Sequence, residues 1–255
     1  MPQAILYICH GSRVKKARDE AVDFIQECQK TISVPIQEIS FLELAEPSIA
    51  EGFETCIQKG ATQIAVVPLL LLTAVHAKKD IPREIAKLHK KYPDISITYG
   101  KPIGVQESMA DAVYEQMNDA MTDKQDTRVL LIGRGSSDPD VKRDMMILAE
   151  LLKERYELSA VDVCFLTAAE PSFETKLAEM NHVSESNILV VPYLLFTGLL
   201  MKGIEKEIKQ MKTDKNIMLC SYIGYSHHVR QAFSKRVHEA LNGEYGFFTF
   251  EEAGQ

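Results

Sequence analysis

Apolar and polar positions along the chain predict a series of alternating strands and helices. Short apolar runs rich in β-branched residues are followed by longer stretches in which apolar residues recur at helical spacing. In the first half we expect strands near residues 4–9, 36–42, 63–70 and 95–100. The helices expected there lie near residues 15–31, 47–59, 79–91 and 105–121. The second half repeats this order, with strands near residues 128–133, 160–165, 187–194 and 217–222. Such alternation is typical of an α/β fold in which helices flank a mostly parallel sheet.

Three segments of the chain recur at a constant distance. Residues 5–12 (ILYICHGS) resemble residues 129–136 (VLLIGRGS). The same offset of 124 positions aligns residues 41–48 with 165–172 and residues 66–73 with 190–197. We therefore predict two tandem duplicated lobes, each with a mostly parallel four-stranded sheet flanked by helices. The predicted lobes are residues 1–124 and residues 125–255, the second being a degenerate copy with a short tail.

Three potential metal ligands occur in only one of the two copies. His10, Glu43 and His76 follow the first three predicted strands, and the second copy has arginine, threonine and leucine at the corresponding positions. Because parallel strands end at the same edge of a sheet, we expect these three side chains to converge. Two imidazoles and a carboxylate suit divalent iron, cobalt, nickel or zinc better than magnesium or calcium. The sequence thus predicts one metal site per chain; the alternative is that each histidine is incidental. The other histidines are expected at the surface, although the adjacent His227 and His228 could also capture a metal ion.

Basic and hydroxyl residues gather near the same predicted edge. Arg13 and Lys78 lie at helix starts, and Arg134 stands where the first copy has its histidine. Cations at a helix start oppose the helix dipole, so their presence favours an anionic ligand. Ser12 and Ser136 could donate hydrogen bonds to the same ligand. The alternative is that the cations are solvated helix ends.

Composition and charge exclude several classes of protein. A formal charge of −7 argues against a nucleic-acid partner bound through a basic surface. Five widely spaced cysteines without a CxxC pair indicate reduced thiols rather than a disulfide framework or a zinc ribbon. The longest apolar run, near residues 64–75, is too short for a membrane span, and the first residues lack the pattern of a signal peptide. We therefore expect a cytoplasmic protein without membrane or nucleic-acid partners.

Several of these segments together resemble a known family. They are His10-Gly11-Ser12 after a strand, the block 43–48, and the segment 68–82. They resemble the class II tetrapyrrole chelatases over nearly the whole chain, and the duplicated length is similar to the fused two-lobed bacterial type of sirohydrochlorin ferrochelatase. This resemblance implies ATP-independent insertion of Fe2+ into sirohydrochlorin, giving siroheme and two protons, with the metal as substrate and no organic cofactor. Cobalt or nickel insertion is an alternative, and a non-enzymatic tetrapyrrole or metal carrier would use the same pocket.

The resemblance also implies roles for individual residues. His10 and His76 match the metal-contacting histidines of the family, and Glu43 matches its acidic metal-binding residue. We expect the histidines to bind the metal and to accept the pyrrole protons, because imidazole titrates near neutral pH, and Glu43 to assist. The macrocycle is expected between the lobes, with its carboxylates held by the basic groups, and one chain would suffice as a monomer. Phosphoryl transfer through His10 is an alternative hypothesis. It is disfavoured because the chain lacks the arginine expected before His10 and has no glycine-rich nucleotide-binding motif.

Overall fold

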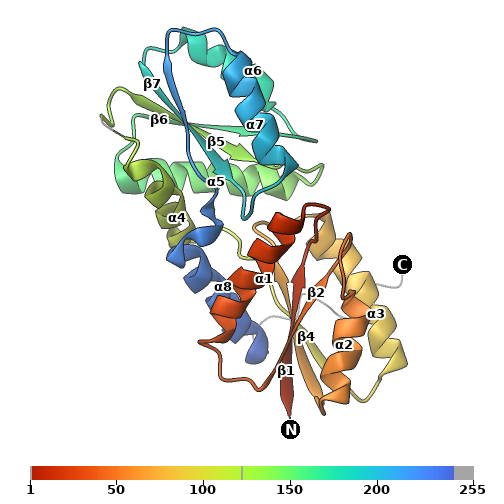
Figure 1. Ribbon diagram of the computed structural model, residues 1–255. Coiled ribbons are helices and arrows are strands. Elements are labelled where there is room, and N and C mark those ends of the chain that lie inside the picture. Colours follow the sequence, from red (N-terminus) through yellow and green to blue (C-terminus); the bar gives the residue numbers. More distant parts are fainter. Residues whose placement is uncertain (1, 122, 244–255) are drawn as a thin grey trace. The chain divides into compact units, whose positions relative to one another are not determined.

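The computed structural model describes residues 2–121 and 123–243 (Figure 1). The chain divides into two compact units, Met1–Gly104 with Arg230–Gln255, and Val105–Val229. Each unit contains one four-stranded sheet whose neighbouring strands are all parallel, which confirms the predicted α/β class. The predicted C-terminal tail lies outside the described residues. Within the described ranges, no helix has both the length and the apolar composition that a membrane crossing requires.

The first unit is a sheet with helices on both faces (Figure 1). In the spatial order β2-β1-β3-β4, its strands are β2 (Ile36–Phe41), β1 (Gln3–Cys9), β3 (Gln63–Leu69) and β4 (Ser96–Tyr99). Its helices are α1 (Lys15–Gln29), α2 (Ile49–Gln58), α3 (Ile81–Lys91) and most of α8 (His227–Leu241), with a π-helical turn η1 (His76–Asp80) between β3 and α3.

Alternating side chains of β1 assign these helices to the two faces. Leu6 packs in one apolar cluster with Phe53 of α2 and Ile85 of α3. The neighbouring Tyr7 points to the other face, where its ring centroid lies 6.0 Å from that of Phe233 in α8. A phenylalanine of α1 also contacts Phe233. Because successive side chains of a strand point to opposite faces, α2 and α3 cover one side of the sheet and α1 and α8 the other.

The second unit repeats this architecture. In the order β6-β5-β7-β8, its strands are β6 (Ala160–Phe165), β5 (Thr127–Gly133), β7 (Asn187–Tyr193) and β8 (Asn216–Leu219). Its helices are α4 (Glu107–Asn118), α5 (Pro139–Tyr156), α6 (Phe173–Glu179) and α7 (Leu199–Gln210), with short 3-10 turns η2 (Met180–His182) and η3 (Ile223–Tyr225). One apolar cluster joins β5 to α6 and α7, and α4 packs against α5 and β7.

The compact units differ from the predicted lobes 1–124 and 125–255 in the last helix of each repeat. Helix α8 belongs to the second repeat but packs on the first sheet, where Thr98 Oγ1 donates a hydrogen bond of 2.9 Å to the carbonyl of Ala240. Helix α4 belongs to the first repeat but packs in the second unit. The repeat shows which residues correspond, but it does not show which of the two sheets each of these helices covers. The choice of sheet is therefore a property of the tertiary structure.

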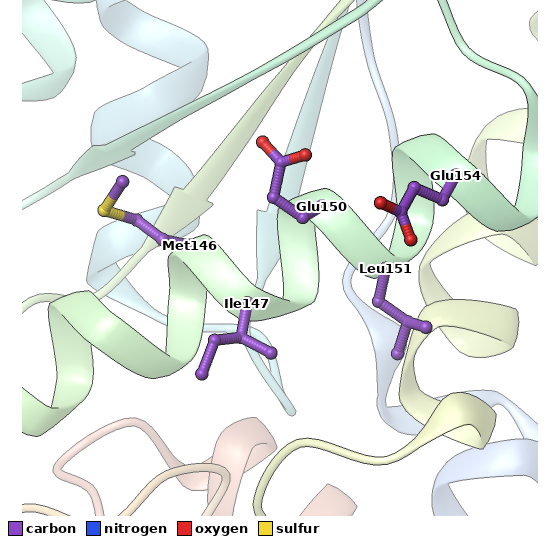
Figure 2. A pocket seen from close by; sticks show the side chains of 5 residues that line it. All are labelled: Met146, Ile147, Glu150, Leu151 and Glu154. Atoms are coloured by element: carbon purple, nitrogen blue, oxygen red, sulfur yellow. The ribbon is translucent and has the colours of Figure 1, made fainter.

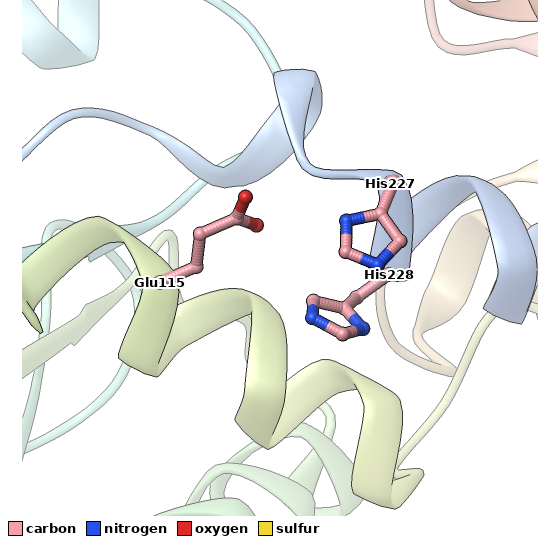
Figure 3. A group of neighbouring side chains, drawn as sticks. All are labelled: Glu115, His227 and His228. Carbon is pink, nitrogen blue, oxygen red and sulfur yellow. The ribbon is translucent and has the colours of Figure 1, made fainter.

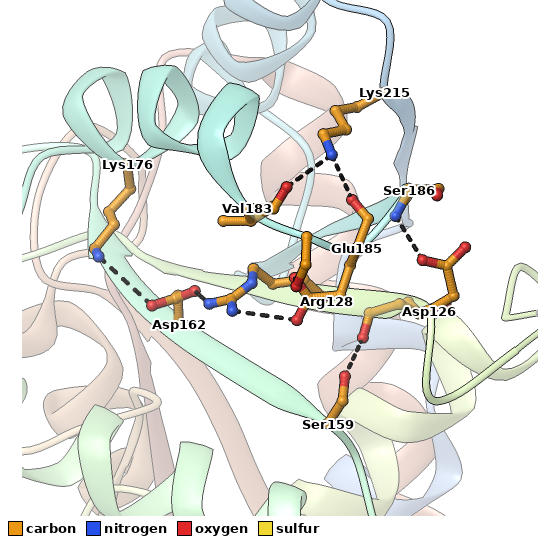
Figure 4. A network of polar contacts seen from close by, with 11 residues as sticks. Asp126, Arg128, Ser159, Asp162, Lys176, Val183, Glu185, Ser186 and Lys215 are labelled. Atoms are coloured by element: carbon orange, nitrogen blue, oxygen red, sulfur yellow. Dashed lines mark hydrogen bonds and ion pairs between the residues drawn. The ribbon is translucent and has the colours of Figure 1, made fainter.

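A network of ion pairs stabilises the amino end of the second sheet (Figure 4). Arg128, near the start of β5, contacts Asp162 at 2.6 Å and Glu185 at 3.1 Å. Lys176 lies 3.5 Å from the second oxygen of Asp162, and Lys215 donates to the carbonyl of Glu185 at 2.9 Å. These groups are largely shielded from water, so their mutual pairing offsets the cost of burying charge. They lie at the strand ends opposite to the edge predicted to bind substrate, which indicates a structural role.

We expect the cysteines to be unreactive in the folded protein. All five are unpaired and buried, and burial raises the pKa of Cys9, Cys56 and Cys164 to about 12 and that of Cys28 and Cys220 to about 11. The reactive species is the thiolate, so an aromatic disulfide reagent should modify the native protein slowly and label five thiols after unfolding in denaturant. Fast stoichiometric labelling of any cysteine in the native protein would contradict this burial.

Candidate metal centre

The three candidate ligands lie at the carboxyl ends of neighbouring strands. His10 directly follows β1, Glu43 follows the end of β2, and His76 opens η1 after β3. Strand β1 lies between β2 and β3, and the helices that follow β1 and β3 cover opposite faces of the sheet. In open α/β sheets this reversal leaves a crevice at the carboxyl ends of the two strands, where ligands bind.

The distances between these side chains fit a single ion. His10 Nε2 lies 3.2 Å from His76 Nε2 and 3.6 Å from Glu43 Oε1, and the two rings are nearly perpendicular at 83°. Two atoms that each bind an ion at about 2.1 Å are separated by about 3.0–3.6 Å when their angle at the ion is about 90–120°. The side chains of His10, Glu43 and His76 are 27%, 49% and 31% exposed, so a bound ion would keep an open side for a second reactant.

Hydrogen bonds to the far side of each ring orient both Nε2 atoms toward the centre. His76 Nδ1 lies 2.8 Å from Asp80 Oδ2, and His10 Nδ1 lies 3.2 Å from the carbonyl of Gly11. A carboxylate and a carbonyl can only accept, so each Nδ1 carries the hydrogen and each Nε2 the lone pair in the neutral ring. Two lone pairs that face each other at 3.2 Å are favourable only with a proton or a cation between them. The ring orientations therefore prepare the pair to bind a cation.

A close backbone contact places Glu43 beside the first histidine. The Glu43 N–H donates to the carbonyl of His10 at 3.1 Å. Gly11 has φ of +94°, and a Cβ atom there would lie 1.8 Å from the Glu43 carbonyl oxygen. Only glycine allows this approach, because any side chain would overlap the neighbouring backbone. The glycine after His10 is thus required for the carboxylate to reach the histidines.

The turn that carries the second histidine is anchored from the end of β4. His76 is the first residue of the π-helical η1, a form of turn that occurs frequently at functional sites. The hydroxyl of the buried Tyr99 donates to the carbonyl of Ala77 at 2.9 Å. Burial raises the pKa of Tyr99 well above its usual value, so the hydroxyl keeps the proton that it donates. This bond fixes the backbone next to His76.

The second repeat keeps the loop but not the ligands. The Thr167 N–H donates to the carbonyl of Arg134 at 2.9 Å, as the glutamate does in the first repeat. Gly135 has φ of +91°, and a Cβ there would lie 1.8 Å from the Thr167 carbonyl oxygen. The same scaffold therefore presents a guanidinium and a hydroxyl in place of an imidazole and a carboxylate.

Both serines predicted to bind an anionic group also shape these loops. Ser12 Oγ accepts a hydrogen bond from the Val14 N–H, and Ser136 Oγ accepts one from the Asp138 N–H, at 3.1 Å in each case. Accepting these bonds leaves the hydroxyl proton of each serine to be donated elsewhere. The two hydroxyls are therefore compatible with a structural and a binding role at once.

The basic residues predicted to bind an anion lie at the surface. Arg13, Lys78 and Arg134 are all exposed. Lys15, at the start of α1, is exposed as well and pairs with Asp19 one turn later at 2.6 Å. The exposure of Arg13, Lys78 and Arg134 is compatible with the predicted role of binding an anionic ligand.

Sequence reasoning missed the carboxylate that orients His76. Asp80 lies in the segment that resembles the chelatases, but its role was not predicted. The signal was present, because a histidine and an aspartate four positions apart face each other on a helix. Cys9, next to His10, is by contrast no candidate ligand, since it is buried and burial raises its pKa to about 12.

A shallow apolar hollow on α5 is unsuited to an acidic ligand. It is lined by Met146, Ile147, Glu150, Leu151 and Glu154 (Figure 2). Met146 and Ile147 are about half exposed, at 53% and 48%. Its polar groups are two carboxylates, which would repel an anion. The hollow is therefore not a candidate for the site of an acidic substrate.

We expect replacement of Asp80 by alanine to weaken metal binding about 10–100-fold, the usual effect of removing the partner that orients a histidine ligand. The physical reason is that the His76 ring loses the bond that holds its Nε2 toward His10. Calorimetric titration with Co2+ measures the change. Asp19→Ala is the matched control, because Asp19 makes an exposed pair four residues away on its own helix. Equal affinity of the two variants would show that Asp80 does not position His76.

The chain is similar to known proteins along nearly its whole length. The CbiX family model matches residues 4–120 and again residues 128–240. The chain is 52% identical to the sirohydrochlorin ferrochelatase of Bacillus subtilis, over 98% of this chain and 97% of the relative. It is 32% identical to the sirohydrochlorin cobaltochelatase of Priestia megaterium, over 95% and 81% respectively. The solved structure of SirB from Bacillus subtilis with Fe3+ matches with a TM-score of 0.91 at 52% identity, over 98% of this chain and 100% of that chain. The predicted resemblance is thereby confirmed, and the chain belongs to the CbiX family.

Proposed function

We propose that this protein is a sirohydrochlorin ferrochelatase, which inserts Fe2+ into sirohydrochlorin to give siroheme and two protons without ATP or an organic cofactor. The observation that carries the proposal is the convergence of His10, His76 and Glu43 at the switch point of the first sheet. The near full-length similarity to the Bacillus subtilis ferrochelatase supports the choice of substrate.

In this mechanism the two imidazoles and the carboxylate receive the metal substrate. Nε2 of His10 and Nε2 of His76 bind the ion, and the charge of Glu43 partly neutralises it. Glu43 is the most exposed of the three ligands, at 49% of its side chain, so it can release the ion most readily. Exchange of protein ligands for the four ring nitrogens then proceeds from the solvent-facing side.

Proton removal uses the same histidines. The metal-free core of the macrocycle loses two N–H protons as its four nitrogens bind the ion, and these protons need acceptors close to the ring. When the ion leaves, the Nε2 lone pairs of His10 and His76 are available to accept them, because each Nδ1 already carries a hydrogen. Metal release and proton uptake are therefore coupled at the same two atoms.

The acidic periphery of the macrocycle requires cations. We assign this role to Arg13 and Lys78 in the first unit and to Arg134 in the second, with Ser12 and Ser136 as hydrogen-bond donors. Guanidinium groups pair with carboxylates through two parallel hydrogen bonds, which makes the arginines the stronger contributors.

We also propose that the enzyme acts in the cytoplasm and as a monomer. Five buried, unpaired thiols are typical of a reducing compartment. All three proposed metal ligands come from the first unit, so the metal centre is complete within a single chain.

Cobalt insertion is the second candidate activity, because the chain is also related to a sirohydrochlorin cobaltochelatase at 32% identity. Histidine and carboxylate ligands do not by themselves separate Fe2+ from Co2+ or Ni2+.

A metal competition assay tests the proposal and separates these candidates. Anaerobic purified protein is mixed with sirohydrochlorin and buffered free Fe2+, Co2+ or Ni2+, and metallation is followed by absorbance against an enzyme-free control. We expect catalysed insertion with Fe2+ preferred at equal free concentrations. A consistent preference for Co2+ would favour the cobaltochelatase. Tight binding of the macrocycle without turnover for any metal would identify a carrier and overturn the proposal.

A further inference from the structure

A second group of metal-binding side chains lies in the second unit, at the junction of η3 and α8. Glu115 of α4 faces His227 and His228 at the start of α8 (Figure 3). One ligand atom from each residue lies within 4.8 Å of the other two. We propose that these three residues form a second binding site for a divalent transition-metal ion, in addition to the centre in the first unit. This inference does not depend on the proposed catalytic activity.

The chemistry and spacing of the group suit such an ion. Two imidazoles with one carboxylate select Fe2+, Co2+, Ni2+ or Zn2+ over Mg2+ and Ca2+. Ligand atoms around one ion lie about 3.0–3.6 Å apart, so the present spacing requires closure by at most roughly 1–2 Å. Glu115 and His227 are exposed and His228 is partly exposed, so rotation of their side chains can supply this movement.

A buried serine holds two of the three residues in place. Ser226 is 2% exposed, and its hydroxyl donates to Glu115 Oε2 while accepting the N–H of His228 at 3.2 Å. One hydroxyl thus ties the carboxylate on α4 to the first turn of α8. Partners of this kind orient metal ligands in established sites and strengthen their binding.

The local charge also favours a cation. Asp111 lies one helical turn before Glu115, and although burial opposes its ionisation, hydrogen bonds from Tyr156 and Arg155 lower its pKa. The resulting negative charge interacts with His228. The positive end of the α8 dipole acts in the other direction. We therefore expect the site to bind metal reversibly, with exchange aided by its exposure.

The first repeat has no histidines at the positions that correspond to His227 and His228. Helices α4 and α8 begin at corresponding positions of the two repeats, at Glu107 and His227. At the start of α4, Glu107 and Ser108 occupy the places of the two histidines. The two histidines are thus specific to the second repeat, which lacks the other set of ligands.

The test uses untagged full-length protein in which His10→Ala and His76→Ala remove the first centre. Equilibrium dialysis with Co2+, read together with the visible Co2+ spectrum, should show that this variant still binds a single Co2+ per chain. Adding His228→Ala and Glu115→Gln should weaken that binding at least about tenfold, whereas the matched pair His182→Ala and Glu179→Gln in the same unit should leave it unchanged.

Two outcomes would overturn the proposal. One is that the His10→Ala, His76→Ala variant binds no Co2+; the other is that its Co2+ binding survives His228→Ala with Glu115→Gln. Circular dichroism and thermal unfolding verify that each variant is folded. If the variant with His228→Ala and Glu115→Gln unfolds, His227→Ala alone is tested instead. His227 is exposed, so its replacement should not disturb the fold, and it too must weaken Co2+ binding.

Discussion

Replacing His76 with alanine is expected to slow Fe2+ insertion into sirohydrochlorin by about 10²–10⁴-fold, the range associated with loss of a positioned proton acceptor. The substitution removes the Nε2 atom that lies 3.2 Å from His10 Nε2, so it takes away a metal ligand and a base together. The side chain is partly exposed, and its loss should leave the fold intact. Initial rates measured by absorbance at saturating Fe2+ and sirohydrochlorin give the effect on turnover.

The control for this variant is His238→Ala. His238 is an exposed histidine of α8 whose Nδ1 lies 2.8 Å from the carbonyl of Ser234, so its removal changes histidine content without touching the proposed centre. We expect wild-type turnover from His238→Ala and the same loss from His10→Ala as from His76→Ala. A folded His76→Ala protein that turns over at the wild-type rate would exclude His76 from the mechanism.

Replacing Gly11 with alanine is expected to lower both the free energy of unfolding and the metal affinity. Its φ of +94° costs about 1–3 kcal/mol for a residue with a side chain. The added Cβ would also lie 1.8 Å from the Glu43 carbonyl oxygen, so the loop that carries the carboxylate must move. Chemical denaturation measures the first effect, and calorimetric titration with Co2+ measures the second.

Two other glycines separate the causes of this loss. Gly60 has φ of +93° with no neighbouring heavy atom within 4 Å, so Gly60→Ala reports backbone strain alone. Gly135 repeats the contact of Gly11, at 1.8 Å from the Thr167 carbonyl oxygen, but in the unit without the proposed catalytic ligands. We expect Gly135→Ala to destabilise the protein as much as Gly11→Ala while retaining Co2+ binding at the first centre. If both variants bind Co2+ equally well, the glycine after His10 does not position Glu43.

Periodicity was sufficient to predict the secondary structure because the central strands β1, β3, β5 and β7 are buried along nearly their whole length, whereas the helices bury one face. The strand expected at residues 160–165 is found at Ala160–Phe165, and the strand expected at residues 63–70 is found at Gln63–Leu69. The convergence of His10, Glu43 and His76 was likewise foreseeable, since it requires only that parallel strands end at one edge.

Contacts between distant segments were not foreseeable in the same way. The exchange of α4 and α8 between the two units depends on which sheet each helix covers, and the repeat in the sequence does not show this. The cluster of Glu115, His227 and His228 forms only because α4 meets the start of α8, more than a hundred residues later in the chain.

The pattern of apolar and polar residues determined the class of fold, and the repeated segments determined the duplication and the confinement of one ligand set to the first copy, because these properties follow from residue identities alone. The three-dimensional packing alone decided that Asp80 orients His76, that the Gly11 backbone touches Glu43, and that a second histidine pair meets a carboxylate. Such contacts depend on side-chain directions and on the pairing of remote elements, which hydrophobic periodicity does not encode.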